Sequence, residues 1–333
     1  MVVAMLKYPL ILLFLSIPTS MLLWLGNVGF SRISNSSEND EDGVIPPTRW
    51  LFSILAPMML MVYALKRKSV CKSGAFLGIV VAFILSIANH AFFVCLVVFF
   101  FSSSKATKFR GQIKKKFEKD FKEGEGQRNW IQVFCNCGVA TLLAILYLID
   151  CGSGEKPINF TNFYRSSWLG LGVMSSFASC NGDTWASELG TVFGSSDPFL
   201  ITNLRRVPKG TNGGISIIGL IVSFLGGLLV GLGYFLTIFY TDDSSNYFNP
   251  PQWPIILIGG CAGLFGSLLD SFLGASFQYS GLDSDGKIAD RPGKHTRHIS
   301  GLSILDNHSV NLISSFLTAV IIPIISVKVW PDV

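Results

Sequence analysis

The 333 residues carry a formal net charge of +5, half of them are hydrophobic, and only 14% are charged. Soluble domains normally have about a quarter charged residues, so this composition and the mean hydropathy of +0.49 exclude an ordinary soluble protein. The basic residues lie in a few loops beside long apolar runs, which is the pattern of membrane proteins rather than of a nucleic-acid-binding surface.

Apolar runs of the length that crosses a bilayer, about 20 residues, recur along the chain. Residues 8–30 exceed a signal-peptide core and have no clear cleavage site, so they predict a retained membrane helix. Residues 74–104 are too long for one span and carry Asn89 and His90 at their middle, which predicts a hairpin of two short helices. The other runs are 47–65, 130–149, 166–180 with 184–189 as a candidate extension, 213–240, 252–278 and 309–330.

These runs predict an all-α fold, a polytopic membrane helical bundle of about nine hydrophobic segments. Residues 1–46 would form an N-terminal membrane helix and an acidic lumenal loop. Residues 47–333 would form a membrane-embedded helical domain of catalytic type, because they hold all the polar motifs described below.

Lys and Arg are distributed unevenly between the two sides of this bundle. Four loops (66–72, 105–128, 181–212 and 279–308) and Lys7 share one side and hold 21 of the 26 basic residues, which predicts that this side is cytosolic. The glycosylation sequons at Asn35 and Asn159 fall on the other, lumenal side. Together with the lack of a transit-peptide pattern, the sequons predict the endoplasmic reticulum or a later secretory membrane.

Several chemically capable residue types form no recognisable site. The seven cysteines and four histidines have no metal-ligand spacing, so the cysteines are expected to be packing residues. Residues 281–288 almost match a P-loop, but Ile288 stands where Ser or Thr must hold magnesium.

The first polar segment with chemical potential is 181–190, at the cytosolic end of a membrane helix. Asp183 and Glu188 are carboxylates beside hydrocarbon, where charges are costly unless they are paired or bind a metal. Mg²⁺ prefers one or two carboxylates plus phosphate oxygens. An N-cap at Asp183 with a solvated Glu188 explains the pattern equally well on chemistry alone.

The second segment, 207–215, precedes a helix whose N-terminus faces the cytosol. The helix dipole and free amides favour an anion there, and glycines let phosphate approach the backbone. The candidate phosphate ligands are Lys209, Gly210, Thr211, Asn212, Gly213 and Gly214. A flexible linker is the competing interpretation.

Two further polar sites follow. Asp270 lies eight residues before Gln278, about 12 Å into its helix, which indicates a functional carboxylate or a structural salt bridge. Asp306 begins the last helix, where an N-cap is the favoured role. Asn307 and Asn311 share one face of that helix.

These residues carry a resemblance that covers nearly the whole length. The chain is similar to the transmembrane protein 19 family, the integral-membrane "domain of unknown function 92" group. The carrying motifs are Ser102-Ser-Ser-Lys-Ala-Thr-Lys108, Gly126-Gln-Arg-Asn-Trp-Ile-Gln-Val-Phe-Cys-Asn136, Gly182-Asp-Thr-Trp-Ala-Ser-Glu188, Val207-Pro-Lys-Gly-Thr-Asn-Gly-Gly214, Asp270-Ser-Phe-Leu-Gly-Ala275 and Leu305-Asp-Asn307. The group also resembles prenyl-phosphate kinases, including phytyl-phosphate kinase, and more distantly dolichol kinase, phytol kinase and phosphatidate cytidylyltransferase.

The resemblance implies an enzyme that uses CTP to convert an isoprenoid monophosphate into its diphosphate at the bilayer surface. Asp183, Glu188 and Asp270 would hold Mg²⁺. Lys209 and residues 210–214 would bind the nucleoside triphosphate, with Asp306, Asn307 and Asn311 beside them. Lys105, Lys108 or Arg128 would bind the acceptor phosphate. A transporter of an anionic lipid or metabolite, and a non-catalytic membrane scaffold, are the competing interpretations.

Overall fold

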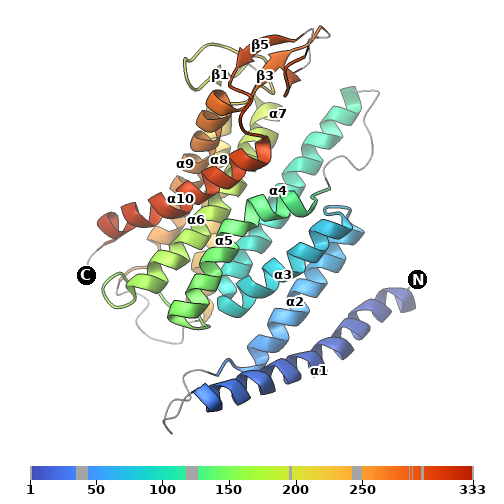
Figure 1. The fold of residues 1–333 in the computed structure, drawn as a ribbon, viewed down its shortest axis with the longest axis vertical. Coiled ribbons are helices and arrows are strands. Elements are labelled where there is room, and N and C mark those ends of the chain that lie inside the picture. The colour runs from blue at the N-terminus through green and yellow to red at the C-terminus, as the bar shows by residue number, and fades with distance from the viewer. Residues whose placement is uncertain are drawn as a thin grey trace.

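Helices dominate the structure, as the apolar runs predict. The structure, a computed structural model, describes residues 2–34, 44–117, 127–194, 197–241, 250–284, 286, 288–293 and 296–331. Within these ranges the nine long helices are α1 (Val2–Ser34), α2 (Pro47–Lys66), α3 (Lys72–Ala88), α4 (His90–Phe117), α5 (Trp130–Cys151), α6 (Tyr164–Trp185), α8 (Ile217–Thr241), α9 (Pro254–Phe277) and α10 (Asn307–Val329) (Figure 1). Asn35, the acidic stretch 38–42 and Gly126 lie outside the described residues.

Six of the described helices are long and apolar enough to cross a membrane: α2, α4 over His90–Gly111, α5, α8, α9 and α10. Helix α3 is shorter, at 17 residues. Helix α6 is rich in Gly and Ser and packs against α4, α5, α8, α9 and α10, so it is the central helix of the bundle. The prediction of a polytopic helical membrane bundle is therefore confirmed.

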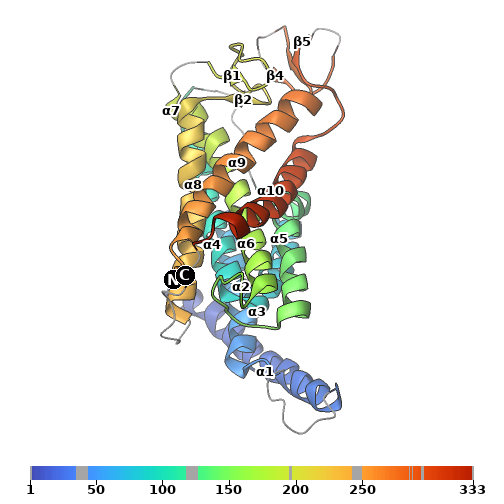
Figure 2. The same ribbon diagram turned by 90° about the vertical axis from the view of Figure 1, so that its left-hand side faces the viewer.

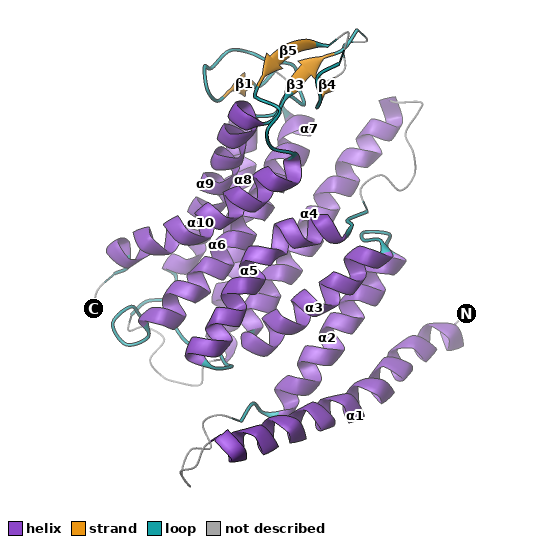
Figure 3. Ribbon diagram, viewed as in Figure 1, coloured by secondary structure: helices purple, strands orange, loops and turns teal. Residues whose placement is uncertain are grey.

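Short strands, which the apolar runs do not predict, cover one end of the bundle. An antiparallel pair joins β1 (Phe199–Leu200) to β2 (Gly214–Ile215), and a three-stranded antiparallel sheet has the order β4-β3-β5. Its strands are β3 (Ser280–Leu282), β4 (Ile288–Ala289) and β5 (Arg297–Ser300). Figures 2 and 3 show these strands together at one end, called the strand-bearing end below. The P-loop-like segment is the β3–β4 hairpin, so its rejection is confirmed.

The predicted break at Asn89 separates α3 from α4. Asn89 has an extended backbone, and its side-chain oxygen accepts a hydrogen bond from the amide of Ala91 at 2.7 Å, which starts the new helix. The expectation that both helices are short is wrong for α4, because its helix continues 28 residues to Phe117. The polar residues that end the apolar run at Ser104 continue the same helix beyond it.

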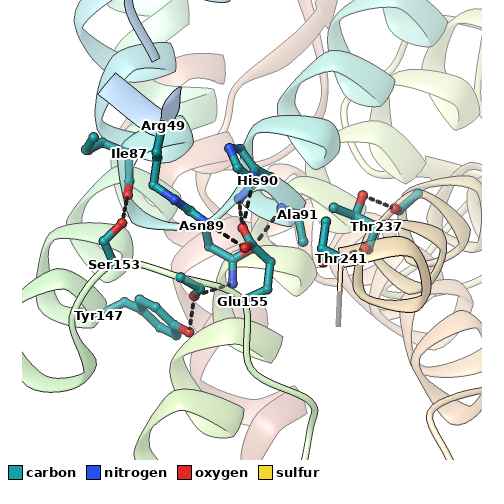
Figure 4. A network of polar contacts seen from close by, with 12 residues as sticks. Arg49, Ile87, Asn89, His90, Ala91, Tyr147, Ser153, Glu155, Thr237 and Thr241 are labelled. Atoms are coloured by element: carbon teal, nitrogen blue, oxygen red, sulfur yellow. Dashed lines mark hydrogen bonds and ion pairs between the residues drawn. The ribbon is translucent and has the colours of Figure 1, made fainter. Parts of the chain in front are cut away.

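A buried ionic network, drawn in Figure 4, ties three segments together where the α5–α6 loop lies, at the end of the bundle opposite the strands (Figure 1). Glu155, in the loop between α5 and α6, pairs with Arg49 of α2 and accepts hydrogen bonds from His90. Both Arg49 and Glu155 have side chains only 10% exposed. The loop is fixed further because the amide of Gly154 donates to Ala88 and Tyr147 donates to Gly154. These bonds clamp α2, α3, α4 and α5 at this end.

Glycines let α6, α8 and α9 pack with their backbones in contact. A Cβ on Gly182 would lie 2.5 Å from the carbonyl oxygen of Gly263, and one on Gly263 would lie 2.6 Å from that of Ser223. Such small-residue contacts are typical of membrane helix pairs, which gain stability from close van der Waals packing. The packing brings the α6 segment that carries Asp183 directly against α9, which carries Asp270.

Candidate active site

One polar cavity of about 440 Å³ lies at the strand-bearing end, inside the ring formed by α4, α5, α6, α8, α9 and α10. Of the predicted site residues, it is lined by Arg128, Asp183, Glu188, Asp270, Asn307, Asn311 and the loop 209–214. The segments that carry these residues are far apart in the sequence, and the bundle brings them to one cavity.

Asp183 lies inside α6, two residues before its end at Trp185, so the alternative that it is an N-cap is excluded. The helix shows no break at Gly182. It continues through Trp185 into a π-helical turn, Ala186–Gly190, and then the short α7 (Thr191–Phe193). The candidate extension of this span is therefore helical. Rare π-turns of this kind are frequent at functional sites.

Asp270 faces the same cavity from α9. Ser314 donates a hydrogen bond to its Oδ2 at 3.1 Å. The amide nitrogen of Asn311 lies 3.1 Å from the same oxygen when the side chain is oriented to satisfy its donors. Asp183 accepts a hydrogen bond from Ser267 and is near enough to Asp270 for the two carboxylates to repel each other.

Neither carboxylate has a cationic side chain as a partner in the described part of the chain. The salt-bridge alternative for Asp270 is therefore not supported there. Two adjacent, half-buried carboxylates are unfavourable without a counterion. The pair therefore offers a divalent cation the oxygen ligands that it prefers.

Glu188 has a different environment, because Arg110 of α4 forms an ion pair with it at 3.1 Å.

No group of three His, Cys, Asp or Glu side chains arranged to hold a metal occurs among the described residues. Mg²⁺ commonly binds proteins through one or two carboxylates and completes its shell with water and phosphate oxygens. Asp183 and Asp270 fit that requirement, and the metal itself stays a prediction.

The glycine-rich loop connects β1 to α8 through β2. Gly213 has a φ of +81°, and a Cβ there would lie 2.6 Å from the Ser271 carbonyl oxygen, so only glycine fits against α9. The amides of Thr211, Asn212 and Gly214 donate to Pro208, Ser280 and Thr211. These three amides are occupied, which restricts any anion-binding role of the backbone to Gly210 and Gly213.

The predicted basic residues fall into two groups. Lys209 lines the cavity and donates to the carbonyl of Gly194 at 2.5 Å. Arg128 also lines it. Lys108, in contrast, donates to the carbonyl of Arg67 at 2.9 Å, and Lys105 lines a separate groove on the outside of α4. The structure therefore brings one of the three predicted acceptor-phosphate residues into the cavity.

Arg128 is held firmly at the cavity wall. Its guanidinium donates to Ser103 at 2.8 Å and to Ser104 at 3.2 Å, and it lies over the ring of Phe99 at 5.4 Å. Its backbone is fixed because Asn129, the next residue, forms a reciprocal capping box with Gln132 at the start of α5. The guanidinium is thus pre-positioned by neutral partners.

Comparison with known proteins shows to which family the chain belongs. The family model described as "Integral membrane protein DUF92" matches residues 55–319. The chain belongs to that family. It is 38% identical over 286 residues to "Protein PGR" of Arabidopsis thaliana, covering 86% of this chain and 99% of that protein.

Two other relatives are more distant. An uncharacterized membrane protein of Methanocaldococcus jannaschii is 28% identical over 82% of this chain and 92% of its own length. "Protein VTE6, chloroplastic" of Arabidopsis thaliana is 27% identical over 60% of this chain and 55% of its own length. No solved structure matches the chain.

In this DUF92 protein the last helix has its predicted cap. Asp306 accepts hydrogen bonds from the amide and hydroxyl of Ser309 at 2.8 and 2.6 Å, and these bonds lower the pKa of Asp306 below its ordinary value. The N-cap role is confirmed, and Asp306 does not line the cavity, whereas Asn307 and Asn311 do.

Several residues that line the cavity had no role predicted from the sequence. They are Thr107, Arg110, Gln132, Asn136 and Ser267. Asn129-x-x-Gln132 carried a readable capping-box signal. Arg110 could have been found only by recognising that α4 continues past the apolar run. Ser267 gave no local signal, because small polar residues in membrane helices are common.

Proposed function

We propose that this protein is a membrane phosphotransferase that uses CTP to convert an isoprenoid monophosphate into its diphosphate. The observation that carries the proposal is that three features meet at one cavity. They are the two carboxylates without a cationic partner among the described residues, Asp183 and Asp270, the glycine-rich loop that carries Lys209, and the guanidinium of Arg128. The family resemblance described above and the similarity to "Protein VTE6, chloroplastic" support it.

The side chains suggest a division of roles across the cavity. Lys209 and the amides of Gly210 and Gly213 would bind the phosphates of the nucleotide from the loop side. Arg128 would bind the acceptor phosphate from the α5 side, where its planar donors suit phosphate oxygens. Mg²⁺, held by Asp183 and Asp270, would supply charge neutralisation between the two phosphate groups.

The reaction is a direct phosphoryl transfer. An oxygen of the acceptor monophosphate forms a bond to the γ-phosphorus, the bond from that phosphorus to the β–γ bridging oxygen breaks, and CDP leaves. A monophosphate is already largely ionised at neutral pH, since its second pKa is about 6. The nucleophile therefore needs positioning more than it needs a general base.

A labelling experiment tests this function. Purified full-length protein is incubated with Mg²⁺, γ-labelled CTP or ATP, and a panel of prenyl monophosphates. We expect label to appear in a prenyl diphosphate, faster with CTP than with ATP. Tight nucleotide binding without transfer to any acceptor would contradict the kinase and favour a scaffold that retained the fold.

The transporter interpretation is less well supported. Transporter sites usually lie near the bilayer midplane, whereas the carboxylates here open into a cavity at the end of the bundle where the strands lie. A phosphotransferase at the membrane surface requires that placement, because its nucleotide arrives from water and its acceptor from lipid.

A further inference from the structure

A second, apolar chamber adjoins the polar cavity. It lies between α2, α3, α4 and α5, and its wall is formed by buried side chains including Met61, Val81, Leu96 and Val133. Arg128, Gln132 and Asn136 line both the chamber and the polar cavity. The two spaces therefore meet at these three residues, with the arginine at their boundary.

The boundary carries the positive charge of Arg128, which the Glu188 carboxylate influences from a distance without forming an ion pair. The bonds that Arg128 makes to Ser103 and Ser104 are to neutral hydroxyls. None of the carboxylates in the described part of the chain forms an ion pair with it. A guanidinium so placed favours an anion, and the adjoining wall favours hydrocarbon. The ligand that matches both features is a phosphomonoester on an apolar chain.

We propose that this chamber binds the first isoprene unit of the acceptor lipid while Arg128 holds its phosphate. The inference rests on the proposed function, because it assigns the acceptor's place in that site. In this arrangement Arg128 contacts the ligand where its phosphate joins the hydrocarbon tail. The side chains of the chamber wall would then determine which tails can bind.

The size of the chamber limits what it can hold. Its free volume is about 40 Å³, and a water-sized group needs roughly 10–15 Å³ on that measure. There is room for a few carbon atoms, so a second isoprene unit must displace a side chain such as Met61. Binding should therefore improve sharply from inorganic phosphate to a five-carbon monophosphate and then change little with tail length.

A groove on the outer surface is the competing location. It has about 550 Å³ between α4 and α8, with Lys105 and Trp185 among its lining residues. The helical segment 185–190 separates this groove from the polar cavity. Trp185 and Leu189 line the groove, whereas Glu188 and its ion-pair partner Arg110 line the cavity. A tail in this groove would be long and lipid-exposed.

Binding measurements on the full-length protein in nanodiscs, without nucleotide, separate the two locations. The probes are ³²P-labelled inorganic phosphate, prenyl monophosphates of five, ten and twenty carbons, and dioleoyl phosphatidate. Val81→Phe fills the chamber, and Val133→Leu is a milder second variant. Leu229→Trp fills the outer groove. Thermal unfolding and CTP binding verify that each variant is folded.

We expect the five-carbon monophosphate to bind on the order of a hundredfold more tightly than inorganic phosphate. Val81→Phe and Val133→Leu should each remove most of that gain, and Leu229→Trp should leave it unchanged. Phosphatidate, with two chains, should bind no better than inorganic phosphate. A gain that grows steadily with tail length and disappears in Leu229→Trp would overturn the chamber and place the tail in the groove.

The outcome is independent of the kinase assay. Chamber-sensitive binding without phosphoryl transfer would support the chamber and contradict the kinase. Transfer that is insensitive to both chamber variants would support the kinase and overturn the chamber. Equal affinity for inorganic phosphate and all prenyl monophosphates would also overturn it.

Discussion

Asp183 and Asp270 lack the cationic partners that stabilise Glu155 and Glu188 elsewhere in the described chain. We therefore predict that Asp183→Asn abolishes phosphoryl transfer and leaves the thermal unfolding temperature in detergent unchanged or raised. Asn keeps the shape and one oxygen, and it removes the charge that a magnesium ion requires and that Asp270 repels. Transfer of label from CTP and an unfolding scan measure the two effects.

The matched control is Asp306→Asn. Asn is as good an N-cap as Asp, and Asp306 lies outside the cavity, so this variant should keep activity and stability. Full activity of Asp183→Asn at limiting magnesium would defeat the metal-binding assignment.

Lys209 offers a test of nucleotide binding. We predict that Lys209→Ala weakens CTP binding about tenfold or more, because a hydrogen bond to a charged group contributes about 1.5–3 kcal/mol. The protein should stay folded, since Lys209 is exposed and its visible bond is to one loop carbonyl. Equilibrium binding of labelled CTP measures the effect. Unchanged affinity would place the nucleotide elsewhere in the cavity.

Glu155 provides a pH-dependent prediction about stability. Burial raises the pKa of this carboxyl, but hydrogen bonds from His90 and Arg49 outweigh it and lower the pKa from 4.5 to about 2. A lowered folded-state pKa stabilises the protein above the unfolded value, and this stabilisation is lost as the pH falls from about 4.5 toward 2. We predict that Glu155→Gln costs about 3–5 kcal/mol at pH 7, because Arg49 is left buried without its partner.

The difference in unfolding midpoint between wild type and Glu155→Gln should shrink progressively below pH 4.5. Thermal scans between pH 3 and pH 7 measure it. A difference that is constant over this range would show that the carboxylate charge is not what holds the α5–α6 loop.

The sequence predicted those residues whose role is set by their immediate neighbours in the chain, and not those that are brought to the site by tertiary packing. An intramembrane carboxylate such as Asp270 and the Asp306 cap are visible in the sequence, because hydrocarbon and helix ends restrict the residues allowed. Arg110, which pairs with Glu188, and Ser314, which donates to Asp270, could not be identified from the sequence, because helix packing brings them to the site. The pairing of Glu188 with Arg110 is likewise a tertiary result.

At the scale of helices and strands, the apolar runs predicted the long helices because bilayer thickness fixes their length. The strands were missed because β1 to β5 have two to four residues each, too few for a period-2 pattern. The π-turn at 186–190 was missed for a related reason. Its own residues carry no recognisable signal for this conformation, and α8 packs against it in the folded structure.

Helix packing gives an element-scale prediction. Gly263→Val should lower the unfolding temperature strongly and abolish CTP binding, because its side chain would collide with the α8 backbone at Ser223 and Gly227. Backbone atoms cannot move aside as side chains do, so α9 must shift and carry Asp270 with it. Gly138→Val in α5 is the matched control, since a Cβ there meets only the Phe134 ring at 3.5 Å. Equal effects of the two substitutions would contradict the packing argument.

For the whole molecule, the distribution of charge predicts which end faces the cytosol. An epitope placed within 110–125 should be accessible after selective permeabilisation of the plasma membrane, and Asn159 should carry an endoglycosidase-sensitive glycan. A lumenal epitope would reverse the whole orientation. The sequons predict a secretory membrane, whereas one relative is named chloroplastic. A fluorescent fusion distinguishes the two compartments, and plastid localisation would contradict the secretory prediction.

The Glu155 network belongs to the α5–α6 loop, at the end of the bundle opposite the strands (Figure 1), whereas the polar cavity lies at the strand-bearing end. It fastens α2, α3, α4 and α5 to one another there, so we expect these helices to move less at the clamped end than at the strand-bearing end. We therefore expect any opening of the cavity to occur toward the strand-bearing end only. Alternating access needs both ends to open in turn, so the clamp gives a mechanical reason why substrate and product should enter and leave on the same side.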